Sequence, residues 1–320
     1  VRKPSPKPEF RELQARILNK KVLDWLLAGP AWLKYAVDLQ LLDTTPEISP
    51  VLQDGSIQKL LARLKGDTAG IPAIKSGRVH YTEAGKAYWD LFFLADTGLK
   101  IRDLGLDREA EEIFRYQSRE GTFTMPPNVK DNYYCMSAIL IASLAKMGYG
   151  DDPRVKNYIR AALSEQMTGG GWDCYGDSFN SEGSCPMDDL NLLMLLGQYV
   201  QYQQGPVLSG AIDLLLSHWQ DGSHLYGFGV GKRFRALEYP AVKYGILRVL
   251  DVLSLYPYAI KSRSFKSMLD FVHAKAVEGR YYVENASPAY ADFDFGQVGE
   301  PSRWLTFLVA RMDKRVEELS

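Results

Sequence analysis

The sequence predicts an all-α fold in which about six inner helices and five to six outer helices close into an α/α toroid. Three observations support this prediction. Apolar helical segments recur with a period of 50 residues, amphipathic helical segments alternate with them, and strand-forming stretches are scarce. Closure of the ring would leave no end repeat with an exposed apolar face, which an open solenoid would have to cap.

Two separate markers give the period. Gly98 and Gly148 end two apolar segments and lie 50 positions apart, and Cys135 and Cys185 open two such segments at the same spacing. Because the two markers agree, we interpret the segments as equivalent members of one helix-pair repeat.

The period extends to six apolar segments, which we expect to form the inner helices. They begin near Pro30, Glu83, Tyr133, Cys185, Glu238 and Glu300. The amphipathic segments between them are expected to form outer helices over residues 50–64, 107–117, 153–166, 207–219 and 261–275. Two further helices are expected over residues 9–18 and 21–27, and a short strand or extended loop over residues 281–284.

The length and the composition predict one ordinary globular domain over residues 9–320, preceded by a basic, proline-rich tail over residues 1–8. Of the 320 residues, 46% are hydrophobic, as in an ordinary globular protein. The net charge is only -1, so electrostatic attraction to nucleic acid or to an anionic membrane is not expected. No apolar run reaches the roughly 20 residues of a membrane span, and no signal peptide is visible. We therefore expect a cytoplasmic protein without an integral membrane segment. Cys174 and Cys185 could pair, but free thiols fit a reducing cytoplasm better.

A glycine-rich turn and the helix-start cysteines carry a family resemblance. The turn QMTGGGW at residues 166–172 repeats QSREGTF at residues 117–123, and the chain ends in GEPSRWLTFLVARM before its last few residues. With the 50-residue helix pair, these features resemble the terpenoid cyclase and protein prenyltransferase superfamily, most of all its single-domain bacterial prenyltransferase-like and squalene-cyclase-like members. The resemblance implies a toroid that binds an isoprenoid or another largely apolar ligand with an anionic head, with or without catalysis.

The main candidate site is the start of the fourth inner helix, in the segment CPMDD. Asp188 and Asp189 occupy the positions of Ala138 and Ile139 in the preceding inner helix, and a carboxylate in an apolar wall needs a partner or a polar cavity. The resemblance implies a catalytic role for Asp188 and Asp189, because class II terpenoid cyclases carry an Asp-x-Asp-Asp motif at this place. In this chain Pro186 stands where the motif has its first acid. The other interpretation is that both acids only interact with the helix dipole.

Ligand-binding residues are expected at the same end of the ring. The expected set is Tyr134, Trp172, Asp173, Cys185, Lys243 and Arg303. Cations in the first turn of a helix are unfavourable for its dipole, so Lys243 and Arg303 either bind an anion, pair with acids or reach solvent. We predict that Asp188 faces a pocket containing Lys243, Arg303 or Tyr134. Trp172 is either a ligand platform or a core residue between repeats.

No metal and no other cofactor are expected. Protein prenyltransferases hold Zn²⁺ with Asp, Cys and His, whereas here Cys185 and Asp188 stand in the reverse order and no His stands near Tyr239.

Two other classes of function stay open. The first is a carbohydrate-active hydrolase or lyase that uses the loop acids Asp173, Asp177 and Glu182. The second is a scaffold without catalysis. An apolar cavity with cations at its mouth would favour the isoprenoid-type ligand, an open acidic cleft would favour a carbohydrate, and a filled ring centre would favour the scaffold.

Overall fold

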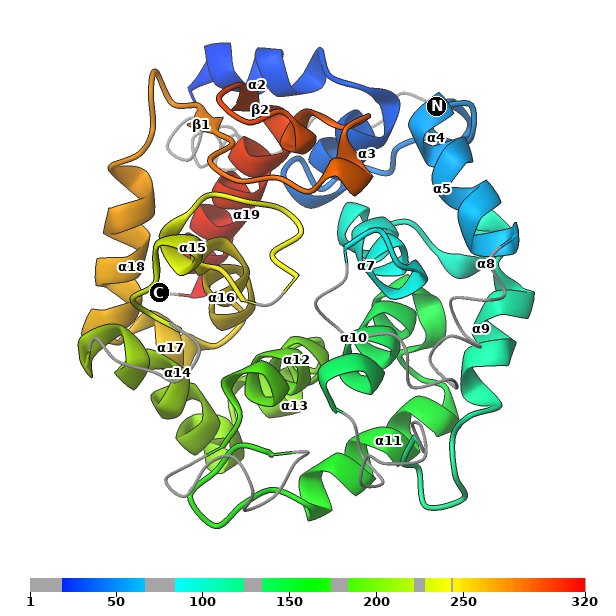
Figure 1. Cartoon of the computed structure of the whole chain (residues 1–320), viewed down its shortest axis with the longest axis vertical. Coiled ribbons are helices and arrows are strands. Elements are labelled where there is room, and N and C mark those ends of the chain that lie inside the picture. The colour runs from blue at the N-terminus through cyan, green and yellow to red at the C-terminus, as the bar shows by residue number, and fades with distance from the viewer. Residues whose placement is uncertain are drawn as a thin grey trace, which may run out of the picture.

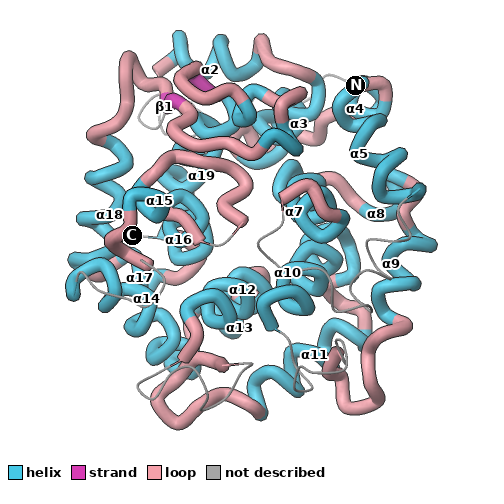
Figure 2. Tube along the Cα trace, in the orientation of Figure 1, coloured by secondary structure: helices cyan, strands magenta, loops and turns pink. Residues whose placement is uncertain are grey.

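The computed structural model describes residues 19–66, 84–123, 134–173, 184–221, 228–242 and 244–319. Over these residues the chain is mostly helical and has one two-stranded sheet, which confirms the expected all-α class (Figure 2). The tail over residues 1–8 and the helix expected over residues 9–18 lie outside the described part. None of the described helices has both the length and the apolar character to cross a membrane.

Six of the described helices lie around the middle of the molecule, and each corresponds to one predicted inner segment (Figure 1). They are α3 (Ala31–Gln40), α7 (Ala87–Thr97), α10 (Tyr134–Leu144), α12 (Pro186–Leu196), α16 (Ile246–Leu253) and α19 (Arg303–Leu319). Each contacts the next in this order, and α19 contacts α3. Helices α7, α10 and α12 are buried on almost every side, as their all-round apolar sequences predict.

The amphipathic segments lie along the rim (Figure 1). The longer ones are α5 (Gly55–Gly66), α9 (Asp107–Phe114), α11 (Pro153–Ser164), α14 (Ser209–Asp221) and α18 (Arg263–His273). Shorter helices are α2 (Lys20–Leu27), α4 (Ser49–Leu52), α8 (Ile101–Leu104), α13 (Val200–Gln203), α15 (Lys232–Arg235) and α17 (Pro257–Ile260). In α11 one stripe is buried and includes Val155, Tyr158 and Ile159, which is the stripe expected from the helical period.

Two helices differ from the prediction for local reasons. The outer helix expected over residues 50–64 is divided into α4 and α5. The division occurs because the Asp54 carboxylate accepts hydrogen bonds from the Ser56 and Ile57 amides and so caps the start of α5. The fifth inner helix begins only at Ile246, since Pro240 lacks an amide hydrogen and disfavours a helical conformation in the residue before it.

The expected short strand is present. Strand β1 (Tyr281–Tyr282) pairs antiparallel with β2 (Pro301–Ser302), with Tyr281 opposite Ser302. Because β2 directly precedes α19, the pairing fixes the start of α19 against the segment that contains β1.

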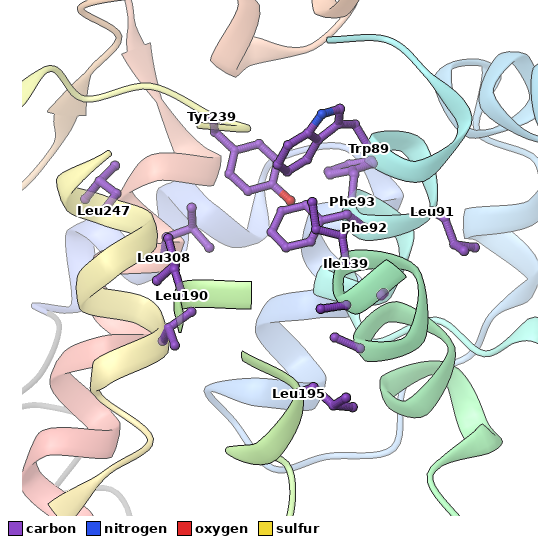
Figure 3. Packing of buried hydrophobic residues seen from close by; sticks show 14 of the residues in the cluster. Trp89, Leu91, Phe92, Phe93, Ile139, Leu190, Leu195, Tyr239, Leu247 and Leu308 are labelled. Carbon is purple, nitrogen blue, oxygen red and sulfur yellow. The ribbon is translucent and has the colours of Figure 1, made fainter. Parts of the chain in front are cut away.

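Aromatic side chains of α7 and α19 pack around Tyr239, which is 6% exposed (Figure 3). The Tyr239 ring stacks on Phe92 at a centroid distance of 6.0 Å and meets Phe93 edge-on at 6.1 Å and Trp304 at 5.4 Å. Its hydroxyl donates to Asp96 Oδ2 at 3.1 Å, so the one polar atom of the ring has a partner in the core. The segment before α16 therefore packs against α7 and α19.

Candidate functional site

The glycine turn packs directly on the start of α12. The Cys185 amide donates to the Trp172 carbonyl at 2.7 Å, and the Trp172 amide donates to Asp189 Oδ1 at 2.7 Å. Gly171 has a φ of 77°, and a Cβ at this position would clash with Ser184 and Asp189. Both the left-handed backbone and the close approach require glycine. The glycine turn and the start of α12 thus form one structural unit.

The Asp189 carboxylate joins this turn to the helix. It is 1% exposed and also accepts a hydrogen bond from the Ser184 hydroxyl. Burial raises the pKa of Asp189 well above its usual range, and the hydrogen bonds from Ser184 and Trp172 offset this only in part. Asp189 therefore contacts two neutral donors, the Trp172 amide and the Ser184 hydroxyl.

Asp188 faces the neighbouring inner helix. It is fully buried, and its Oδ1 accepts a hydrogen bond from Cys135 Sγ of α10 at 3.0 Å. The predicted partner Tyr134 lies near enough for the Asp188 charge to contribute to its raised pKa, after burial and the hydrogen bond that Tyr134 donates to Glu165 at 2.6 Å. Asp188 therefore contacts a thiol of the neighbouring helix, and the pocket predicted around it stays a prediction.

The other predicted ligand-binding residues lie in different surroundings. Trp172 is fully buried, and its Nε1 donates to the Ala162 carbonyl of α11 at 2.7 Å, which matches the core interpretation. Asp173 is partly buried beside it. Arg303 lies at the start of α19, where its Nε donates to the Trp25 carbonyl at 3.0 Å and its guanidinium covers the Trp25 ring. These contacts place Arg303 with α2 rather than with α12, and Lys243 lies outside the described residues.

Three potential metal ligands converge where α10 and α12 begin. The Sγ atoms of Cys135 and Cys185 and a carboxylate oxygen of Asp188 all lie within 4.8 Å of one another, and both cysteines are free thiols. Cys185 and Asp188 are close in sequence, whereas Cys135 joins them only through the fold. The missed signal was the repeat itself, because residues one period apart lie at the same level of neighbouring inner helices.

Sequence reasoning also missed Arg248, which is a buried residue of α16. It is 6% exposed, and its guanidinium lies over the rings of Trp89 at 5.0 Å and Phe92 at 5.6 Å. It donates to the side chain of Asn191, whose amide in turn donates to the Cys135 carbonyl at 3.0 Å. A buried arginine on an apolar helix was the available signal, because such a cation needs aromatic or polar partners in the core.

A pocket of about 610 Å³ lies beside α15 and the chain segments that lead into α7 and α16. Its apolar lining consists of Ala84, Tyr239, Pro240, Val242, Ala286 and Pro288. Its polar lining consists of Lys232, Arg233, Glu238, Asn285 and Ser287. Burial raises the pKa of Glu238, while Asn285 donates to its carboxylate and Arg233 Nε lies 3.6 Å from it.

A second polar cluster lies at the other ends of the inner helices, around a cavity of about 100 Å³. Asp96 meets Lys146 at 2.8 Å and Arg311 at 2.9 Å, and Asp251 meets both Arg311 and Arg315 at 2.9 Å. Burial alone would raise the pKa of Asp96, but Arg311 and Lys146 hold it well below its usual range. The cluster ties α7, the end of α10, α16 and α19 together.

Comparisons with known proteins do not identify a family. No protein-family model matches the chain, and a search of curated proteins finds no match. The resemblance to the terpenoid cyclase and protein prenyltransferase superfamily therefore stays a prediction.

Proposed function

We propose that the chain is an α/α toroid that binds a small, largely apolar molecule with an anionic head, such as an isoprenoid diphosphate. The observation that carries this proposal is the lining of the 610 Å³ pocket, where apolar side chains stand beside Lys232 and Arg233. A volume of this size is within the usual range of small-molecule sites, which are mostly apolar with a few polar groups that orient the ligand.

The closed sequence of contacts from α3 through α7, α10, α12 and α16 to α19 supports the toroid in this proposal, together with the rim of amphipathic helices. In such an arrangement the segments before the inner helices meet at one end of the ring. Ala84 before α7 and Tyr239 before α16 both line the pocket, which is consistent with a ligand site at that end.

The two cations provide the site for the anionic head. Lys232 is exposed, and the Arg233 side chain is 58% exposed and only 3.6 Å from Glu238. Glu238 is buried, but the separation of 3.6 Å is longer than a hydrogen bond and the guanidinium is mostly exposed, so a phosphate or carboxylate can still bind its other N–H groups. The apolar part of the ligand would then cover Val242 and Pro240.

We propose binding without alkene protonation by Asp188 or Asp189. An acid catalyst must be within hydrogen-bond reach of the reacting atom. Asp188 accepts from the Cys135 thiol, and Asp189 accepts from Trp172 and Ser184. The carbohydrate alternative gains no support from Trp172, because a fully buried indole cannot serve as a sugar platform; Asp177 and Glu182 lie outside the described residues.

A scaffold without a ligand is the second candidate, and the aromatic packing around Tyr239 favours it. A thermal-shift screen separates the two candidates. It would compare isoprenoid diphosphates of increasing chain length with the matching alcohols and with inorganic diphosphate. Our proposal predicts the largest rise in Tm for the isoprenoid diphosphates and a smaller rise when Lys232 and Arg233 are both replaced by Ala. The scaffold predicts no shift with any of these compounds.

A further inference from the structure

We propose that Cys135, Cys185 and Asp188 form a binding site for a thiophilic divalent metal ion, with zinc preferred. The inference is independent of the ligand pocket proposed above. It rests on the convergence of two thiols and one carboxylate from two neighbouring helices.

The distances between the ligand atoms are close to those of a metal site. In a tetrahedral zinc site with Zn–S bonds of about 2.3 Å and Zn–O bonds of about 2.1 Å, ligand atoms are separated by about 3.5–3.8 Å. Here the three atoms lie within 4.8 Å of one another, and Cys135 Sγ lies 3.0 Å from Asp188 Oδ1. Side-chain movements of about 1 Å would bring them to this geometry, which is within the reach of rotamer adjustment.

The backbone holds the ligands in place from both helices. Cys185 immediately precedes α12 and Asp188 lies three residues later, so the two side chains share one face of its first turn. The Cys185 amide is tied to the glycine turn through the Trp172 carbonyl, and Asn191 of α12 donates to the Cys135 carbonyl. Such contacts outside the ligand set orient the ligands and are a normal part of metal sites.

The ligand types select the metal. Two thiolates favour zinc over magnesium, calcium and manganese, which prefer oxygen ligands. Three protein ligands leave a fourth position open, as in zinc sites that bind water or a substrate group. Cys185 is the partly exposed member of the set, whereas Cys135 and Asp188 are buried, so a fourth ligand can approach from the side of Cys185.

Metal binding lowers the number of protons bound to the two cysteines. Both cysteines must lose a proton to become thiolates, so loading releases two protons to the buffer. The hydrogen bond from the Cys135 thiol to Asp188 is lost, and the same carboxylate oxygen becomes a ligand. Two thiolates and one carboxylate with a divalent ion carry a net charge of -1, which equals the charge of two neutral thiols and one carboxylate without the metal.

The test uses the untagged full chain, purified with a reductant, and compares it with three variants. We expect about one zinc per chain by elemental analysis, and Co²⁺ loading should give thiolate-to-cobalt charge-transfer absorption in the near ultraviolet. Cys185→Ser and Asp188→Asn should each lower metal content and weaken this absorption. Asp189→Asn is the matched control, because Asp189 is buried in the same helical turn but lies outside the ligand set. It should keep the metal.

Three outcomes would overturn the proposal. The reduced wild-type chain could bind neither zinc nor cobalt; Cys185→Ser could keep the full metal content; or mass spectrometry could find a Cys135–Cys185 disulfide in protein that takes up no metal after reduction. Circular dichroism of Cys185→Ser separates loss of metal from loss of fold. Because Cys185 is only partly buried, we expect this variant to remain helical.

Discussion

Cys135 and Asp188 lie on neighbouring inner helices, and the thiol donates a hydrogen bond to the carboxylate at 3.0 Å. The contact places a buried acid against a soft sulfur ligand at the start of α12. Asp189, the next residue, contacts the glycine turn on another side. Two adjacent carboxylates of the same helix start therefore have separate roles, and variants of the two should behave differently.

The first prediction concerns the pH dependence that Asp189 contributes. Its folded-state pKa is raised by burial, so the folded chain holds this proton more tightly than the unfolded chain does. Its stabilising contribution is complete below the ordinary aspartate pKa and is lost as pH rises toward the raised value. Asp189→Asn keeps an acceptor for the Trp172 amide and has no such proton to lose. The Tm of this variant relative to wild type should therefore rise from pH 5 to pH 8.

Thermal melting at several pH values provides the measurement. Asp189→Ala is the companion variant, and it should lose about 1–3 kcal/mol because the Trp172 amide and Ser184 hydroxyl lose their acceptor. A Tm difference between Asp189→Asn and wild type that stays constant with pH would show that this carboxyl does not titrate as described.

The second prediction concerns Gly171. Gly171→Ala should lower the free energy of unfolding by more than the backbone strain of about 1–3 kcal/mol, because its Cβ would also clash with Ser184 and Asp189. Gly148→Ala is the control, since Gly148 also has a positive φ of 116° but has open space around the added Cβ. Urea unfolding of both variants measures the difference. Equal losses would mean that the close approach at Gly171 contributes nothing.

The third prediction concerns the buried ion cluster. Asp96→Asn leaves Lys146 and Arg311 without their shared carboxylate, and breaking such a buried group should cost about 3–5 kcal/mol. Because the pKa of Asp96 is lowered, its stabilising contribution is present above the ordinary aspartate pKa and is lost as pH falls toward the lowered value. The wild-type advantage over Asp96→Asn should therefore shrink in acid.

The control for this variant is Asp292→Asn. Asp292 pairs with Lys59 at 2.8 Å, but both side chains are mostly exposed, and such a pair contributes about 0–1 kcal/mol. Urea unfolding at neutral and acidic pH compares the two variants. Similar small losses for both would contradict the role given to Asp96.

The sequence was sufficient for the features that repeat. The 50-residue period located the inner helices, and it placed Cys135 and Cys185 at equivalent starts, which is why their side chains can meet. The amphipathic pattern with helical period also located the longer rim helices. The start of α16 was missed, because an apolar segment of helical composition was given more weight than the Pro240 within it.

The remaining site features depend on contacts between distant parts of the chain. The Tyr239 hydroxyl reaches Asp96 across 143 positions, and Arg248 reaches Asn191 across 57. Neither pairing can be recognised from the neighbouring sequence, because a buried polar group can form a hydrogen bond with any partner that the fold brings near it. The acids at 188 and 189 were identified from the sequence, but their partners could be known only from the structure.

The most direct test of the proposed function is whether a ligand occupies the pocket beside α15. Ala286 lines its apolar side, so Ala286→Trp should place an indole where the apolar part of the ligand would lie while leaving Lys232 and Arg233 unchanged. Calorimetric titration would use the isoprenoid diphosphate that raises the wild-type Tm most. We predict saturable binding to wild type and loss of that binding in Ala286→Trp, with the helical signal of the variant unchanged. Equal binding by the variant, or no binding by either protein, would contradict the assignment of this pocket.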